Sequence, residues 1–270
     1  MTRSRICDEV LESKCIGCGK RTYGLIKSLF SFHGVKSNRN KLRVVDKFIA
    51  VSSFVKKVHM TYLALDSRHI VVIPNFYEVR KEEILAEQNS KMKKGEIFPE
   101  DFILFVGILA PYKGVNTLIE SCHDMNRRTK LVLIGVKDKN HSYGTTDNTI
   151  VIENASDNLV REAYSKCRFS IIPSIWPDPC PTVAFEAMAF KRPTIASAVG
   201  GLSEIVKHNE TGLVVPPNNP SELAKAIGYL LERPALVQEM GMKGYNRLIE
   251  HFSVDKVTSR IETVYEEVNG

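Results

Sequence analysis

The segment that decides the fold is 101-DFILFVGILAPYKGVNTLIE-120, in which an apolar run meets a turn and then a helical pattern. The run shows no polar alternation, which is typical of a strand buried on both faces of a parallel sheet. Gly107 ends the run, the turn forms around Pro111, and Lys113-Gly114 opens the helix. The segment therefore predicts a strand followed by a helix.

The same pattern repeats from Asp46 onward. Helical patterns lie between apolar runs, with Ser52 or Ser53 as the expected cap of residues 54–65 and Ser221 as the expected cap of residues 223–232. The repeats predict an α/β fold with a doubly wound parallel sheet, which binds ligands at the carboxyl ends of its strands. The predicted strands are KFIAVSS (47–53), HIVVIPN (69–75), DFILFVG (101–107), TKLVLIG (129–135), TIVIEN (149–154), RFSIIPS (168–174), RPTIASAVG (192–200) and GLVVPP (212–217).

Composition places the chain among globular proteins, with 43% hydrophobic and 25% charged residues over 270 positions. These values exclude disordered and fibrous classes. No run reaches the roughly 20 apolar residues of a membrane span, and residues 1–10 lack the apolar core of a signal peptide. We therefore expect a cytoplasmic protein, and we expect no nucleic-acid partner.

Basic charge is concentrated at the N-terminal end. Residues 1–58 hold 13 Lys and Arg against 4 Asp and Glu, a local charge of +9, whereas the whole chain carries +6. Residues 20–43 hold seven basic residues, no acid and interleaved apolar side chains, a pattern that fits peripheral contact with the anionic inner face of a membrane. A solvated basic surface or a partly disordered start is the favoured alternative.

Three of the six cysteines, Cys7, Cys15 and Cys18, cluster in this N-terminal segment. Cys15 and Cys18 have the spacing of a zinc hairpin, but no second pair follows to complete a tetrahedral site, and His33 is a weak candidate ligand. A reduced thiol cluster or an incomplete structural metal site is the preferred interpretation. The remaining thiols are expected to be buried or loop residues of a reducing compartment: Cys122, Cys167 and Cys180.

The distribution of strands divides the sequence into four segments. Residues 1–76 hold two strand signals and are expected to be the remnant of an N-terminal domain, and the charged residues 77–99 are expected to be a linker. A Rossmann-like domain is expected over 100–252, and a closing helix over 253–270.

Two of the strand-to-helix junctions suit an anion. Gly107 lets the backbone approach a ligand, and Lys113 adds a positive charge at a helix start. The pair Gly200-Gly201 is expected to offer backbone N–H groups in the same way. Each motif alone also fits an ordinary turn.

A third junction, 173-PSIWPDPCPTVAFEAMAF-190, carries a carboxylate in an apolar helix. Four prolines restrict the loop, and Thr182 and Glu186 lie four apart on one face of a helix that starts at Pro181 or Thr182. A buried carboxylate needs a partner. Lys191, Arg192 or a backbone N–H is one alternative for Glu186, and a pair of ligand hydroxyls such as those of a ribose is the other.

Together these motifs resemble the retaining, nucleotide-sugar-dependent glycosyltransferases of family 4 (glycosyl transferases group 1), which have the two-domain GT-B fold. The resemblance covers the chain from about Asp46 to the end. It rests on six segments in order: Val106-Gly107 with Lys113-Gly114; Pro173-Ser174; Asp178 through Glu186-Ala187-Met188-Ala189; Gly200-Gly201 with Glu204; Gly212-Leu213-Val214-Val215-Pro216; and His251-Phe252-Ser253.

The resemblance implies a role for each motif. Asp178 and Glu186 are the two acids that flank the donor site, with Glu186 on the ribose hydroxyls and Asp178 facing the donor sugar or its phosphates. Lys113 binds the diphosphate, Gly107 belongs to the same donor site, and the Gly200-Gly201 turn completes the sugar-phosphate pocket. The sugar-phosphate pocket is lined by Pro179, Cys180, Pro181 and Thr182. Neither a cofactor nor a metal is expected.

The sequence departs from the family at three points. Ile108 stands where the family usually has an arginine, Asp178 stands where it usually has a longer glutamate, and most of the acceptor-side N-terminal domain is missing. We expect the donor-binding part of a hexosyltransferase that uses a UDP- or GDP-linked sugar and a glycan or lipid-linked acceptor, with a separate N-terminal-domain subunit as a candidate partner. The alternatives are a non-catalytic nucleotide-sugar-binding subunit or truncated remnant, and, less favoured, a GT-B-like epimerase.

Overall fold

The computed structural model describes residues 16–17, 20, 24–79, 97–123, 128–138, 144 and 146–270. The chain forms two compact units, one of Met1–Ile73 with Ser259–Gly270 and the other of Pro74–Thr258. The first is called unit 1 below, and the second unit 2. The cysteines Cys7, Cys15 and Cys18 and most of the expected linker, residues 80–96, lie outside the described residues. The predicted domain limits at 76, 99 and 252 stay a prediction.

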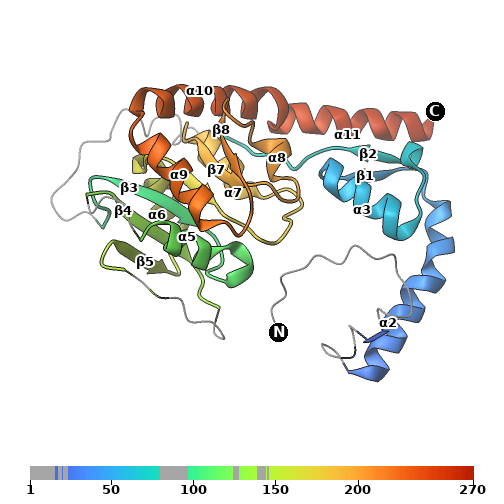
Figure 1. The fold of residues 1–270 in the computed structure, drawn as a ribbon. Coiled ribbons are helices and arrows are strands. Elements are labelled where there is room, and N and C mark those ends of the chain that lie inside the picture. The colour runs from blue at the N-terminus through green and yellow to red at the C-terminus, as the bar shows by residue number, and fades with distance from the viewer. Residues whose placement is uncertain are drawn as a thin grey trace. The chain divides into compact units, whose positions relative to one another are not determined.

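Unit 2 is built on a six-stranded, all-parallel sheet in the order β5-β4-β3-β6-β7-β8 (Figure 1). This order is that of a Rossmann fold, in which the order of the strands along the sheet reverses between β3 and β6 while all strands stay parallel. The strands are β3 (Phe102–Val106), β4 (Lys130–Gly135), β5 (Thr149–Glu153), β6 (Ser170–Ile172), β7 (Thr194–Ser197) and β8 (Gly212–Val215). The α/β, doubly wound parallel sheet predicted from the sequence is confirmed.

Helices cover both faces of this sheet, which explains its unalternated apolar strands. Ile103 and Phe105 belong to one core cluster with residues of α5 and α9, whereas Phe102 and Leu104 belong to a second cluster with residues of α6 and α7. The helices of unit 2 are α5 (Val115–Ser121), α6 (Asp157–Lys166), α7 (Thr182–Ala189), α8 (Leu202–Ile205), α9 (Pro220–Leu231) and α10 (Pro234–His251).

One predicted cap is wrong. The side chain of Asn219, not that of Ser221, accepts the hydrogen bond from the Glu222 N–H at the start of α9. Pro220 is the physical reason, because proline favours the first helical position and the residue before it therefore becomes the cap. The other predicted cap is confirmed, since Ser52 accepts from the Val55 N–H.

Unit 1 contains a two-stranded parallel sheet of β1 (Phe48–Ala50) and β2 (Ile70–Val72), as the sequence predicts. Its other elements are α2 (Leu25–Asn38), the 3₁₀ helix η1 (Arg39–Val44), α3 (Ser53–Leu63), the 3₁₀ helix η2 (Ser67–His69) and the part of α11 (Val254–Asn269) that follows Thr258. The predicted closing helix corresponds to α11.

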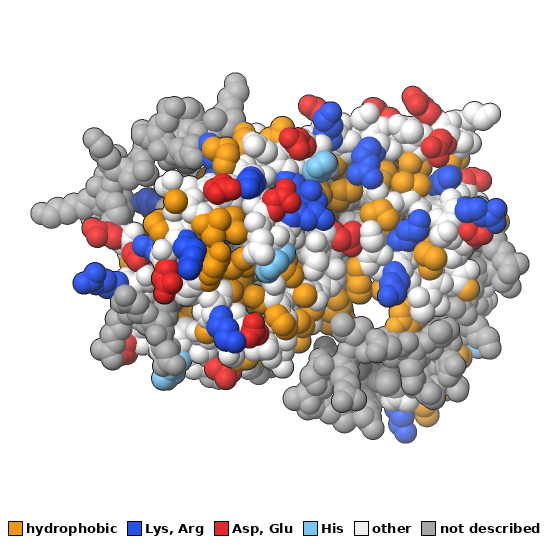
Figure 2. Space-filling model, turned by 45° about the horizontal axis from the view of Figure 1, so that its top comes forward, with side chains coloured by type: hydrophobic (Ala, Val, Ile, Leu, Met, Phe, Trp, Pro, Cys, Tyr) orange, Lys and Arg blue, Asp and Glu red, His pale blue; other side chains and the backbone are white. Residues whose placement is uncertain are grey.

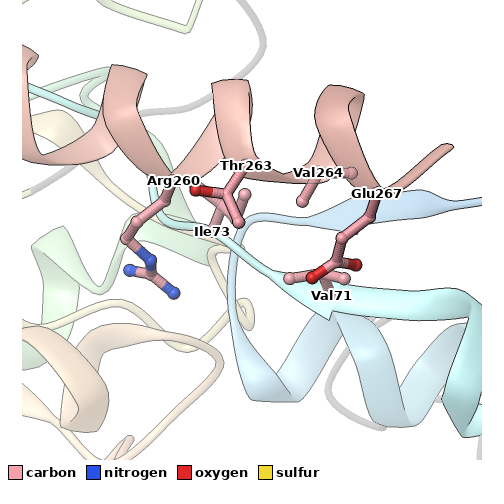
Figure 3. Close-up of a pocket in the computed structure, with 6 residues that line it drawn as sticks. All are labelled: Val71, Ile73, Arg260, Thr263, Val264 and Glu267. Atoms are coloured by element: carbon pink, nitrogen blue, oxygen red, sulfur yellow. The ribbon is translucent and has the colours of Figure 1, made fainter. Parts of the chain in front are cut away.

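A shallow pocket of about 200 Å³ lies where α11 packs on β2. Figure 3 shows Val264 of α11 beside Val71 and Ile73, with Arg260 and Glu267 at the two ends of the contact. Arg260 donates to the carbonyl of Val72. Lys47 lies 3.6 Å from the Glu267 carboxylate. These contacts attach the C-terminal helix to the small sheet.

Candidate functional site

The candidate site lies at the carboxyl ends of three neighbouring strands. The loops after β3, β6 and β7 carry the three motifs singled out in the sequence, and β3 and β6 flank the point where the strand order reverses. Ligands of doubly wound folds bind at this reversal, because adjacent loops diverge there and leave a crevice.

The loops after β3 and β6 are joined through their backbones. The carbonyl of Tyr112, in the 3₁₀ helix η4 (Pro111–Lys113), accepts hydrogen bonds from the N–H groups of Ile175 and Trp176, at 2.9 and 3.0 Å. Gly114 has φ of +77°, and a Cβ atom there would lie 1.9 Å from the carbonyl oxygen of Pro173. Only glycine therefore permits this close approach.

Lys113 and Asp178 meet across this junction. The Lys113 ammonium lies 2.8 and 2.9 Å from the two carboxylate oxygens of Asp178. The Ser174 hydroxyl, which is 1% exposed, donates to Oδ2 of Asp178 at 2.9 Å. The structure thus brings together two of the predicted site residues, and it adds Ser174.

The loop after β7 supports Asp178 from its backbone. Gly200 has φ of +56°, and a Cβ atom there would lie 2.2 Å from the Asp178 carbonyl oxygen. The Gly201 N–H donates to that same oxygen at 2.8 Å. In contrast to the expectation, the N–H of Gly201 is therefore used within the protein. The N–H of Gly107 is also used, by the carbonyl of Ile134 at 3.0 Å.

Helix α7 starts in the third loop as predicted, with Pro181 as its cap residue and Thr182 as its first residue. The cap residue Pro181 makes no side-chain cap hydrogen bond, and the Ala184 N–H donates to the Pro181 carbonyl at 3.3 Å. The positive end of the helix dipole at this start suits an anion. The Asn75 amide donates to the carbonyl of Cys180 at 3.1 Å, which holds the loop just before the helix. Pro179 is exposed at the loop surface.

Glu186 lies half-buried one turn into α7, beside the phenol of Tyr164. Burial of Tyr164, together with the nearby Glu186 carboxylate, raises the pKa of that phenol well above its ordinary range. The Tyr164 hydroxyl donates to the carbonyl of Val183 at 3.3 Å and shares its single proton with the neighbouring Glu186 carboxylate. The neutral phenol is therefore suited to orient that carboxylate.

Two of the partners expected for Glu186, Lys191 and Arg192, also make contacts with other residues. Arg192 donates to the carbonyls of Tyr164 and Ser165. The Lys191 ammonium lies 5.5 Å from the centre of the Tyr245 ring.

Sequence reasoning missed Ser174, Tyr164 and Asn75. Ser174 had a usable signal, because it directly follows the apolar run of a predicted strand, where site residues of this fold class lie. Asn75 had the same signal, because it follows the apolar run of the predicted strand 69–75, although its partner lies 105 residues away. Tyr164 had none, since a tyrosine in a helix carries no local pattern.

Within the part of the chain that the structure describes, no group of three His, Cys, Asp or Glu side chains is placed to hold a metal ion. No described helix has the length and apolar character needed to cross a membrane. On the face in Figure 2, acidic and basic side chains are interspersed among the described residues.

Comparison with known proteins agrees with this arrangement. The family model for glycosyl transferases group 1 matches residues 87–247, more than half of the chain. The chain belongs to the glycosyl transferases group 1 family. An uncharacterized glycosyltransferase of Methanocaldococcus jannaschii is 32% identical over 233 residues, which cover 83% of this chain and 60% of that protein. The capsular polysaccharide biosynthesis glycosyltransferase CapM of Staphylococcus aureus is 23% identical over 226 residues, or 80% of this chain and 58% of CapM.

Solved structures show the same fold as this member of the glycosyl transferases group 1 family. The Anabaena protein HepE in complex with UDP matches with a TM-score of 0.75 at 18% identity, over 86% of this chain and 67% of HepE. HepE in complex with UDP-glucose matches with a TM-score of 0.72. The six-stranded sheet of unit 2 is thus a GT-B Rossmann-like sheet. The chain spans about three fifths of the length of the two curated relatives named above.

Proposed function

We propose that unit 2 is the donor site of a retaining family 4 glycosyltransferase that moves a hexose from a UDP- or GDP-linked sugar to a glycan or lipid-linked acceptor. The donor binds across the loops after β3, β6 and β7. Lys113 and the start of α7 hold the diphosphate, and Glu186 holds the two ribose hydroxyls. Gly107, Pro179, Cys180, Thr182 and the Gly200-Gly201 turn form the walls of the pocket.

One observation carries this proposal: a lysine and the start of α7 lie on adjoining loops where the strand order reverses, and a half-buried carboxylate lies one turn into that helix. A nucleotide diphosphate sugar needs a cation and N–H donors for its phosphates and an acceptor for its ribose hydroxyls. The relatives agree in kind, since HepE binds UDP and UDP-glucose and CapM takes part in capsular polysaccharide synthesis.

The same groups stabilise the diphosphate as the leaving group of the reaction. As the glycosidic bond of the donor breaks, negative charge grows on the diphosphate, and a lysine and helix dipole already aimed at it stabilise that charge. Ile108, 45% exposed, stands where the family usually has a second cation. The loss of one charge-assisted hydrogen bond weakens donor affinity by about 1.5 to 3 kcal/mol.

Isothermal titration of the full chain with UDP and with GDP tests the proposal. We expect one of the two nucleotides to bind to the wild-type protein, and Glu186→Ala to weaken that binding about tenfold, as a lost hydrogen bond to a charged acceptor would. Glu232→Ala on the exposed end of α9 is the matched control and should bind as wild type. Equal affinity in wild type and Glu186→Ala removes the ribose role, and no binding of either nucleotide removes the proposed function.

The acceptor half of the reaction stays a prediction. A radiolabelled transfer assay, with and without a supplied acceptor-side subunit, shows whether this chain needs such a partner. Contact of the basic segment 20–43 with an anionic membrane is tested by co-sedimentation with vesicles that contain phosphatidylserine.

A further inference from the structure

The positive charge of Lys113 already has a counter-ion in this structure. Its ammonium contacts both carboxylate oxygens of Asp178, at 2.8 and 2.9 Å, and the two side chains are only 23% and 13% exposed. A pair shielded from water to this extent is screened less by salt than a surface pair. The lysine is therefore engaged before any ligand arrives.

Asp178 is the stationary member of this pair. Its carboxylate accepts from the buried Ser174 hydroxyl, and its carbonyl accepts from the Gly201 N–H. The Asp178 backbone has no room to shift toward the β7 loop, because Gly200 packs closely against it. The Lys113 side chain is flexible by comparison, since four rotatable bonds separate its ammonium from the backbone.

The diphosphate and Asp178 compete for one cation. Ile108 carries no charge, so Lys113 is the cation of the first loop, and no second one on that loop can take its place beside Asp178. A phosphate that binds the Lys113 ammonium has to draw it away from the two Asp178 carboxylate oxygens that it already contacts. The ion pair thus opposes binding of a bare nucleoside diphosphate.

We infer that Ser174 and Asp178 form a built-in counter-ion for Lys113, and that a nucleotide sugar binds by drawing Lys113 from Asp178 to its diphosphate. The inference rests on the proposed function. It makes Asp178 a counter-ion of Lys113, a role separate from direct contact with the donor sugar. Ser174 is a positioning residue, because it acts through Asp178. When the nucleoside diphosphate product leaves, the ion pair forms again and keeps the product from holding the site.

The test is a titration of UDP, or of GDP if that nucleotide binds, into a double-mutant cycle of the full chain. Asp178→Asn keeps the shape of the side chain, removes its charge, and should tighten nucleotide binding about tenfold. In the Lys113→Met background the same change should tighten binding less than threefold, because no cation is left to release. Asp147→Asn, an exposed acid at the opposite end of the sheet, makes the same charge change and should bind as wild type.

Ser174→Ala separates positioning from a purely structural role. Release of the Asp178 carboxylate should tighten nucleotide binding two- to threefold, whereas a merely destabilised loop would weaken it. Ser165→Ala, a half-buried serine of α6, is the control for loss of a hydroxyl.

Three outcomes overturn the inference. The first is unchanged or weaker nucleotide binding by Asp178→Asn. The second is an equal gain in affinity from Asp178→Asn with and without Lys113, which would mean simple repulsion between Asp178 and the diphosphate. The third is weaker nucleotide binding by Ser174→Ala. If Lys113→Met binds too weakly to titrate, the cycle is measured from urea midpoints of the ligand-free variants, where a coupling of zero overturns it as well. These results leave the proposed function standing, whereas a wild-type protein that binds neither nucleotide ends both.

Discussion

Gly114 sets how closely the first loop of the site approaches the third. A Cβ atom at this position would lie 1.9 Å from the Pro173 carbonyl oxygen, at a φ of +77°. We expect Gly114→Ala to lower the free energy of unfolding by about 2 to 4 kcal/mol through steric overlap and left-handed strain.

Gly228 in α9 gives the matched control, because nothing lies within 4 Å of the Cβ that Gly228→Ala would add. The same substitution there should raise the free energy of unfolding by about 0.5 to 1 kcal/mol, since alanine favours a helix. Urea titration followed by circular dichroism measures both variants. A Gly114→Ala protein as stable as Gly228→Ala would contradict the close approach of the two loops.

Tyr164 lies behind Glu186 and has no route to a ligand of its own, because it is fully buried. Tyr164→Phe removes the hydroxyl beside the Glu186 carboxylate and so loosens the orientation of that carboxylate. We expect nucleotide affinity to fall about fivefold, the equivalent of about 1 kcal/mol for one hydrogen bond.

Tyr229→Phe, on the exposed face of α9, is the control for Tyr164→Phe and should leave nucleotide titration unchanged. Reduced stability with unaltered affinity in Tyr164→Phe would make the tyrosine a packing residue and no more.

The sequence identified Lys113 by its place at a strand-to-helix junction, Glu186 as a carboxylate in an apolar helix, and Asp178 by the family resemblance, but it did not reveal the contact between Lys113 and Asp178. Lys113 and Asp178 are 65 residues apart, and their ion pair depends on β3 and β6 being neighbours. Strand order is a tertiary property that no local pattern encodes. Ser174 was quoted only as part of a motif for the same reason.

At the scale of elements, prediction succeeded wherever burial on both faces produced a continuous apolar run. All eight predicted strands are present, from β1 to β8, and both sheets are parallel. Helix starts were less certain, because several residues near a start can accept the same N–H hydrogen bond. At α9 the choice between Asn219 and Ser221 depended on Pro220.

This choice is itself testable. Asn219→Ala removes the acceptor of the Glu222 N–H and should cost about 1 kcal/mol of unfolding free energy. Ser221→Ala, on the exposed side of the first turn, should change stability by less than about 0.5 kcal/mol. Thermal and urea unfolding of the two variants side by side decide between the caps, and a larger loss in Ser221→Ala would restore the cap predicted from the sequence.

At the scale of the whole of unit 2, one buried thiol lies in the core on each side of the sheet. Cys122 belongs to the cluster of α5 and α9, and Cys167 to the cluster of α6 and α7. Burial raises the pKa of each thiol from 9.0 to about 12. Neither thiol can ionise without exposure, so each reports on the opening of its own side of the core.

Unfolding of unit 2 should therefore become easier as pH rises above 9. The unfolded chain releases each thiol proton near pH 9, whereas the folded chain keeps it until about pH 12, so stability is intact below pH 9 and is lost between these values. From pH 8 to pH 10 each thiol should account for a loss of about 1.4 kcal/mol. Urea titrations at pH 8, 9 and 10 measure this slope in wild type, Cys122→Ala and Cys167→Ala. Over that range each variant should lose about 1.4 kcal/mol less unfolding free energy than wild type, although its stability at pH 8 is lower. A slope equal to that of wild type would mean that the substituted thiol is open to solvent in the folded protein.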